Sequence, residues 1–208
     1  MSAPSYPLTM PTSPTNFRQS EWKIISAVSM TQSPYSYSQQ VADYGGSLWQ
    51  TTVSLPPMNR ATASEWQTFF MQLHGRYGTF LLSPPDERTI RGAEDSSPTV
   101  NGAHSVGAYD IVIQGAKVSS TVFKKGDYVQ FGTGATSKLH MVVADITSNG
   151  AGGATLQIEP KLKTALADDA TITFSSPKAV MRMDSNELGW TANQLSTYGI
   201  SFSCTEAL

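Results

Sequence analysis

The sequence feature that most constrains the fold is the stretch Trp49–Met58, together with the segment that follows it as far as Leu82. In its first part, alternate positions share one face of an extended chain: Trp49, Thr51, Val53 and Leu55. This period of two predicts a half-buried strand. Pro56-Pro57 ends the strand because proline has no N–H to donate to a sheet. The short apolar run Thr79–Leu82 predicts a second, buried strand.

Between these two strands, large apolar residues recur at helical spacing: Trp66, Phe69, Phe70 and Leu73. Positions i, i+3, i+4 and i+7 lie on one stripe of a helix. Asn59 is a candidate N-cap, and Thr62 with Glu65 has the spacing of a capping box. Gly75 follows the last apolar position, where a left-handed C-cap favours glycine. A helix with so bulky an apolar face must lie on a sheet.

The chain before this unit predicts an antiparallel meander. Trp22–Met30 alternates and reads as a strand, Ser33-Pro34 makes a turn, and a second strand begins at Tyr35. Asp43–Gly46 has the composition of a turn, after which a third strand returns from Leu48.

The chain after the unit changes character. Ser83–Gly107 has no apolar run and predicts a linker or long loop. Five short strands separated by turn signals follow it: Tyr109–Gln114, Asp127–Phe131, Leu139–Ile146, Ala154–Glu159 and Ala170–Phe174. Such a run predicts a small β-barrel, and an OB-like and an SH3-like barrel fit the pattern equally well.

The last segment resumes the earlier pattern, since Tyr198, Ile200, Phe202 and Cys204 alternate along one strand. We expect this strand to join the first sheet. The predicted organisation is therefore a mainly β protein with one discontinuous domain, residues 1–97 and 176–208. A small barrel, residues 98–175, is inserted into it.

Charge and cysteine content exclude several classes of protein. The 208 residues carry a net charge of −2, and only 14% are charged, against about a quarter in typical domains. A protein that binds nucleic acid through its phosphates needs a basic face. The slightly negative net charge and the low content of charged residues do not favour such a face. The single cysteine rules out an intrachain disulfide. No signal peptide and no membrane-length apolar run is recognisable, so we expect a soluble chain made in a cytoplasm, without membrane insertion.

The sequence offers no convincing enzyme, and it predicts no catalytic residue, cofactor site or metal site. The histidines lack metal-ligand spacing and read as structural or exposed: His74, His104 and His140. Three acidic pairs sit in turns and read as solvated loop charges: Asp86-Glu87, Glu94-Asp95 and Asp168-Asp169. Cys204 reads as a buried thiol. The glycine clusters Gly132–Gly134 and Asn149–Gly153 read as hairpin turns.

One alternative function attaches to the barrel. Four lysines could form a small basic patch there: Lys124, Lys125, Lys161 and Lys163. OB-like barrels bind nucleic acids or sugars by stacking on aromatic side chains. The candidates for stacking are Tyr109, Phe123, Tyr128 and Phe131, and several of them must instead fill the barrel core.

Most of the chain from Phe17 onward resembles the distal tail proteins and related tail-tip components of long-tailed, siphovirus-like bacteriophages. The stretches that carry the resemblance are Ser33–Tyr35, Gly45–Trp49, Leu55–Met58, the aromatic helix with Leu73–Leu82, Phe123–Gln130, Leu156–Pro160 and Tyr198–Phe202. These motifs are structural and none is catalytic.

The resemblance implies a β-sandwich related to tail-tube proteins, with a flanking helix and an OB-like domain. It also implies a structural virion protein that forms a ring, commonly a homohexamer, at the tail tip. Such a ring joins the tail tube protein to the tip or baseplate hub and forms part of the conduit for genome ejection. It is assembled in the host cytoplasm, and host-surface glycan contact is a possible addition. The alternative is a carbohydrate- or nucleic-acid-binding module acting through the OB-like barrel.

Two further expectations concern assembly. The arm Met1–Asn16 has too little apolar character to fold alone, so we expect it to order on a neighbouring subunit or on the next ring. We also expect phage DNA to pass through the bore without specific binding, because a lining that held phosphate tightly would retain the genome.

Overall fold

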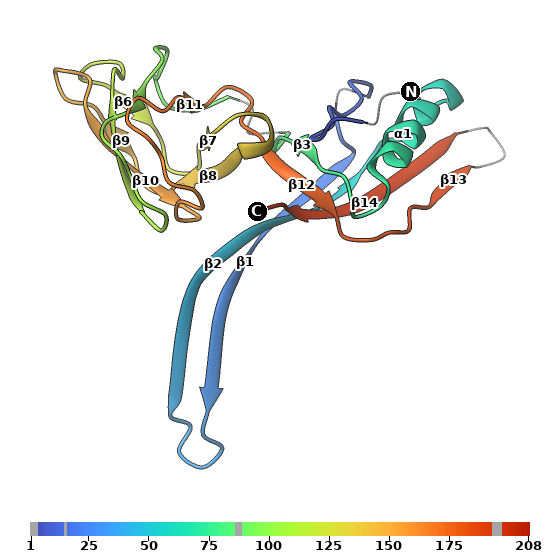
Figure 1. Ribbon diagram of the computed structural model, residues 1–208, viewed down its shortest axis with the longest axis horizontal. Helices are drawn as coiled ribbons and strands as arrows, with labels where there is room; N and C mark the ends of the chain where they lie inside the picture. Colours follow the sequence, from blue (N-terminus) through green and yellow to red (C-terminus); the bar gives the residue numbers. More distant parts are fainter. Residues whose placement is uncertain (1–3, 15, 86–88, 193–196) are drawn as a thin grey trace.

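The computed structural model describes residues 4–14, 16–85, 89–192 and 197–208. The described chain is mainly β, with one α-helix, and it has three parts (Figure 1). A barrel-like sheet lies on one side, a twisted sheet carrying the helix lies on the other, and a long β-hairpin extends away from both. The predicted fold class, mainly β with one flanking helix and a small barrel, is confirmed at this level.

The first sheet has the strand order β1-β2-β14-β12-β3, with β13 paired to β14. Its strands are β1 (Gln19–Gln32), β2 (Gln39–Ser54), β3 (Phe80–Leu82), β12 (Ala179–Met183), β13 (Trp190–Ala192) and β14 (Tyr198–Glu206). All the pairings are antiparallel. The terminal strand β14 pairs with β2 from Ser201↔Ser54 to Thr205↔Gln50. This confirms that the end of the chain returns to the first sheet.

Helix α1 (Arg60–Leu73) covers one face of this sheet with its aromatic stripe. Trp66, Phe69, Phe70 and Leu73 are all buried, as predicted. The ring of Phe202 on β14 lies 5.1 Å from that of Phe70. The layer that packs on this sheet is therefore helical.

A side chain caps the N-terminus of α1, and a left-handed backbone conformation caps its C-terminus. The Asn59 side chain accepts a hydrogen bond from the N–H of Thr62 at 3.0 Å, so Asn59 is the N-cap. At the C-terminal end, the predicted cap, Gly75, lies one residue after the observed one. The C-cap is His74, in the left-handed region at φ 51°, and Gly75 follows it at φ 65°.

The N-terminal segment packs on its own sheet and helix. Leu8 forms a parallel bridge with Phe80, which extends the sheet beyond β3. The carbonyl of Ser13 accepts a 2.7 Å hydrogen bond from the indole N–H of Trp66. The expectation that Met1–Asn16 orders only on a neighbour is therefore wrong for residues 4–14. Few apolar residues are needed to order this segment, because Leu8 and Met10 pack against a core that β3 and α1 already form.

The second sheet follows the order β11-β7-β8-β10-β5-β4. Its strands are β4 (Thr99–Val100), β5 (Asp110–Gln114), β7 (Tyr128–Phe131), β8 (Lys138–Val142), β10 (Ala154–Glu159) and β11 (Ile172–Thr173). Val100 at one end of the path exchanges backbone hydrogen bonds with Asp169 and Ala170, which precede the other end. The sheet is thus nearly closed, and β6 (Thr121–Phe123) with β9 (Ile146–Thr147) forms a separate pair beside it.

The barrel prediction holds in outline and fails in two details. The expected strand Leu139–Ile146 is two strands, β8 and β9, separated by three residues. The expected loop Ser83–Gly107 contains β4. Strands of two or three residues show no alternation, so the sequence does not reveal them. The choice between an OB-like and an SH3-like barrel stays a prediction.

The division into two domains also stays a prediction, and contacts bear on its first boundary. Ala93 donates a backbone hydrogen bond to Thr121 at 2.9 Å, and Gly92 donates to the carboxylate of Asp127 at 3.1 Å. Residues 91–96 were expected to belong to the first domain, yet they lie against the barrel strands.

The predicted meander is a single hairpin. The turn predicted at Ser33-Pro34 is confirmed, since the chain reverses over Ser33–Ser38, but β2 runs unbroken through Asp43–Gly46, where a second turn was predicted. The Asp43 carboxylate accepts a 2.8 Å hydrogen bond from Gly45, whose φ is 71°, so this stretch has true turn chemistry. It forms a bulge within β2, where the register shifts between Ser26 and Val28 of β1.

The packing of α1 gives a stability prediction. Trp66 has no exposed surface and contacts the rings of Phe69, Phe70 and Phe202. Trp66→Ala should lower the free energy of unfolding by about 3–5 kcal/mol, as large buried aromatic deletions do. Met71→Ala on the same helix is the control, because Met71 is exposed. Urea denaturation measures both, and equal small changes would show that α1 does not hold the sheet.

Candidate assembly surface

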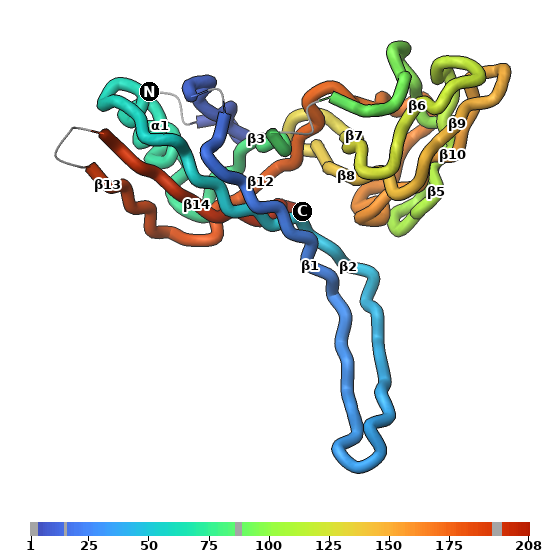
Figure 2. The backbone as a smooth tube through the Cα atoms, turned by 180° about the vertical axis from the view of Figure 1, so that it is seen from behind, coloured from blue at the N-terminus to red at the C-terminus, as the bar shows by residue number. Residues whose placement is uncertain are grey.

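The β1–β2 hairpin projects away from the rest of the described chain (Figure 2). Every residue from Lys23 to Gly46 is exposed, apart from the half-buried Ser33 at the turn. An isolated two-stranded hairpin is marginally stable in water. Within the described chain, no other element packs on either face of this hairpin between Lys23 and Gly46.

One face of the hairpin is apolar apart from Asp43, which pairs with Val28. Met30 pairs directly with Val41 on the same face, two residues away from Val28. The side chains of Met30, Val41 and Val28 are 59%, 63% and 50% exposed. The opposite face is small and polar, since Ser29 pairs with Ala42 and Thr31 with Gln40. The hairpin is thus amphipathic and has no core of its own.

Both long edges of the hairpin are open in the described part of the chain. β1 is the last strand of its sheet, so its outer edge has no neighbouring strand. On the other side, β14 covers only Gln50–Ser54 of β2, and the part from Gln39 to Trp49 has no strand beside it. Open edges carry unpaired N–H and C=O groups that a further strand can meet. The two edges differ in sequence, so they are distinct surfaces.

The hairpin is also almost free of charge. From Ile24 to Leu48 the sequence contains one formally charged residue, Asp43, amid serines, threonines and glutamines. Lys23, just before this stretch at the base, forms an exposed ion pair with Glu21 at 2.9 Å. This surface therefore has no basic group with which to bind phosphate.

The base of the hairpin is anchored by Trp49. Its ring packs against Trp22 of β1 at 6.1 Å and against Tyr128 of the barrel at 5.8 Å. The indole N–H donates a 2.9 Å hydrogen bond to the carbonyl of Leu139 on β8. One residue thus joins the hairpin, the first sheet and the barrel.

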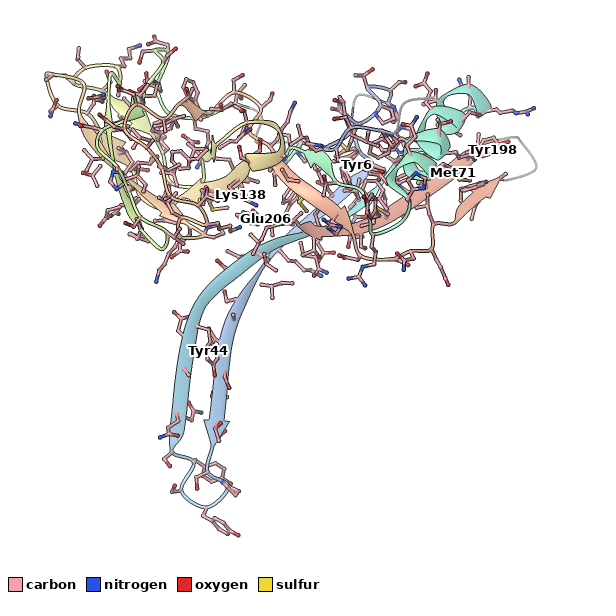
Figure 3. All side chains as sticks on the ribbon, in the orientation of Figure 1. Tyr6, Tyr44, Met71, Lys138, Tyr198 and Glu206 are labelled. Carbon is pink, nitrogen blue, oxygen red and sulfur yellow. The ribbon has the colours of Figure 1, made fainter. Side chains whose placement is uncertain are left out.

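A buried ionic cluster lies beside this anchor (Figure 3). The Glu206 carboxylate forms an ion pair with Lys163 and accepts a 3.2 Å hydrogen bond from the backbone N–H of Trp49. Lys138 donates to the carbonyl of Ala207 at 2.7 Å. Burial lowers the pKa of both lysines, and the negative charge of Glu206 opposes that shift. The cluster ties the end of β14 to the barrel.

The histidines have structural positions. The ring of His104 accepts a 3.2 Å hydrogen bond from the N–H of Val112, and His74 caps α1. His140 is fully buried against Phe131, and Nδ1 lies 2.5 Å from the carbonyl of Pro160. Desolvation lowers the pKa of His140 to about 4, which the bond to Pro160 partly opposes. Across the described residues, no cluster of histidine, cysteine and carboxylates has the geometry of a metal site.

One acidic pair differs from its prediction. Glu94 is buried, where a solvated loop charge was expected, and it accepts backbone hydrogen bonds from Asp95, Ser96 and Lys117. A carboxylate that accepts hydrogen bonds from three backbone N–H groups can be buried without a cation. Asp169 accepts from the side chain of Gln114, and Asp86-Glu87 lies outside the described residues.

The remaining candidates are placed as follows. Cys204 is buried, and burial raises the pKa of its thiol. Gly132–Gly134 connects the paired strands β7 and β8, as expected, but it leads into a short 3-10 helix, Gly134–Thr136. Asn149–Gly153 is a turn between β9 and β10, which pair with other strands and form no hairpin. The predicted basic patch does not form as one surface, because Lys163 is turned inward to Glu206.

The barrel shows little of what an aromatic binding platform needs. Three of its four candidate stacking residues are buried: Phe123, Tyr128 and Phe131. A groove of about 360 Å³ lies elsewhere, between α1 and the segment leading into β13. It is lined by uncharged residues that include Met71, His74 and Trp190.

No family model matches the chain, and no curated protein matches it. No helix within the described ranges is long and apolar enough to cross a membrane.

Sequence reasoning missed the length of the hairpin and the ionic cluster. For the hairpin a signal was present, because Ile24–Leu48 combines alternating apolar residues with almost no charge. For the cluster there was none, since Lys163 and Glu206 are 43 positions apart and nothing in the sequence pairs them.

The buried ion pair gives a second stability prediction. Lys163→Met should lower the free energy of unfolding by about 3–5 kcal/mol, because it leaves Glu206 buried without a counter-ion. Lys117→Met, which breaks the exposed pair with Asp95, should change it by less than about 1 kcal/mol. The double variant Lys163→Met/Glu206→Met should recover only part of the loss, because the backbone N–H of Trp49 then lacks its acceptor. If the two single lysine variants are equally stable in urea, the cluster does not hold the barrel.

His140 gives a pH prediction. Its pKa in the folded chain is about 4, below the ordinary value of 6.5. Between these values the unfolded chain binds a proton that the folded chain excludes, so stability falls as pH decreases from 6.5 to 4. The loss is on the order of 3 kcal/mol from this residue. Thermal denaturation of the parent chain and of His140→Asn across this range isolates the effect, and parallel curves for the two proteins would contradict it.

Proposed function

We propose that this chain is a structural virion protein that forms a ring at the distal end of a phage tail. The ring joins the tail tube protein to the tip or baseplate hub and forms part of the conduit for the ejected genome. The family resemblance supports this function, and the hairpin with its two open, unlike edges is the observation that carries it.

A ring of identical subunits closes only when each subunit presents two different, complementary surfaces. The outer edge of β1 and the distal edge of β2 meet this requirement. Pairing β1 of one subunit with β2 of the next continues the antiparallel order, and closure leaves no free edge. The apolar side chains Val28, Met30 and Val41 then lie on the outer face of the paired hairpins, where other parts of the assembly would cover them. A homohexamer, as the resemblance implies, is the expected closed form.

The polar face of the hairpin suits the bore of such a ring. Ser29, Thr31 and Gln40 are uncharged and interact weakly with phosphate, so DNA is not held as it passes. The conduit is therefore passive, and the virion tail tip is the site of function. The alternative, a carbohydrate- or nucleic-acid-binding module using the barrel, gains no support from the buried aromatic residues there.

Oligomer mass tests the ring. The parent chain should sediment and scatter light as one closed oligomer, and Met30→Lys should reduce it to monomers by placing a charge within the covered face. Met71→Lys is the matched control, since Met71 is 65% exposed but lies on α1. A lasting monomer with glycan affinity would instead favour the binding module. If Met30→Lys assembles as well as the parent, the hairpin is not the assembly surface.

The passive conduit gives a separate prediction. The intact oligomer should show no binding of duplex DNA at physiological salt in a fluorescence anisotropy titration up to micromolar protein. Ser29→Lys/Thr31→Lys should acquire salt-sensitive binding, because it places phosphate-binding cations on the bore face. Micromolar or tighter binding by the parent chain would contradict the passive lining.

A further inference from the structure

We propose that the hairpin turn Ser33–Ser38 is a docking loop, which seats on an uncharged, concave surface of the tail protein that adjoins the far end of the hairpins. This inference rests on the proposed ring and names the partner of its free end. We call this segment the tip loop.

The tip loop exposes large side chains that serve no folding purpose. Tyr35 is 95% exposed and Tyr37 is 73% exposed. The loop otherwise consists of serine and one proline. Tyrosine supplies a large, rigid contact area with one hydroxyl, and serine supplies adaptable hydrogen bonds, which is the composition of surfaces that bind other proteins. Tyrosine is also enriched among the residues that dominate binding energy.

The loop is organised before any partner arrives. The Ser33 N–H donates to the carbonyl of Ser38 at 2.9 Å, and the Tyr37 N–H donates to the carbonyl of Ser33 at 3.0 Å. The hydroxyls of Ser36 and Ser38 lie 2.9 Å apart. Tyr37 itself is held in the left-handed region at φ 56°, which a tyrosine rarely adopts. A loop ordered in this way loses less conformational entropy on binding.

The position of the tip loop decides between its own subunit, a neighbouring subunit and another tail protein as its partner. Figures 1 and 2 show the tip loop at the far end of the hairpin, away from the barrel and from α1, so it cannot seat on its own subunit. In the proposed ring the hairpins lie edge to edge, and their tips emerge together at one end of the bore. The bodies of neighbouring subunits are then equally far from the tips. The surface that the tips meet belongs to the next protein along the tail.

The absence of charge in and around the tip loop limits the kinds of surface that it can bind. Between Ile24 and Ala42 no residue carries a charge, so nucleic acid and acidic surfaces gain nothing from this loop. An uncharged pocket that buries a tyrosine ring and accepts a hydrogen bond from its hydroxyl fits it. Each ring presents one tip loop per subunit. Contacts that are weak individually therefore bind the adjoining protein with high avidity when they form together.

The experiment uses the full chain with p-benzoylphenylalanine in place of Tyr35, assembled into tails in host cells. Purified tails are irradiated, and the cross-linked products are identified by mass spectrometry. Tyr77 is the matched control position, since it is as exposed as Tyr37 but follows α1 on the body. Position 35 should cross-link to a different tail protein, and position 77 should not give that product.

A pair of variants completes the test. Tyr35→Ser/Tyr37→Ser should form an oligomer of unchanged mass, yet its incorporation into tails should fall at least tenfold relative to Tyr77→Ser. Cross-links only to a second copy of this chain, or an altered oligomer mass, would assign the loop to ring closure and overturn the inference. Normal incorporation of the double variant would overturn it as well. Absence of the parent chain from tails would instead refute the proposed function itself.

Discussion

The structure depends on the interactions of one side chain, Trp49, at the place where three parts of the molecule meet. Its backbone N–H is bound by Glu206 of β14, its indole N–H is bound by Leu139 of the barrel, and its ring packs on Trp22 of the hairpin. A buried indole needs a partner for its N–H, and here the partner lies in another part of the fold. The base of the hairpin is therefore held in place by both the sheet and the barrel. An exposed hairpin can have a defined direction only if its base is held in this way.

The ionic cluster beside Trp49 has a different role from the apolar packing. Burying Lys163 with Glu206 costs desolvation free energy that the ion pair only partly offsets, so a pair of apolar residues would serve stability as well. What the charged pair adds is specificity, because Glu206 must find both Lys163 and the N–H of Trp49. We infer that it selects one placement of the barrel relative to the hairpin. In a ring, a constant placement in every subunit is what lets all copies make the same contacts.

The sequence predicts those elements whose signal is local and periodic. Helix α1 and the proximal half of β2 follow from the spacing of Trp66 to Leu73 and of Trp49 to Leu55, since each buries a continuous apolar stripe. The distal half of β2 was not predicted, because Asp43 and Gly45 form a real local turn contact. The same contact between Asp43 and Gly45 can reverse the chain or form a bulge within a strand. The pairing of β2 with β1 around Ser26 and Val28 decides that it forms a bulge. The buried state of Glu94 and its three N–H donors likewise depends on tertiary contacts.

The hairpin also shows what the proposed assembly would require of the free chain. Soluble proteins protect open strand edges with lysines, prolines, bulges or short strands. Here the bulge near Ser26 and the charge of Asp43 are present, but no lysine lies between Ile24 and Leu48. A lysine would protect the edges of the free chain, yet in a bore it would bind the passing phosphates. Since one surface cannot satisfy both demands, the proposed ring would protect the edges only once neighbouring subunits cover them. In that proposal, the lack of charge that suits the hairpin to a lining also leaves its edges free to pair with a neighbour.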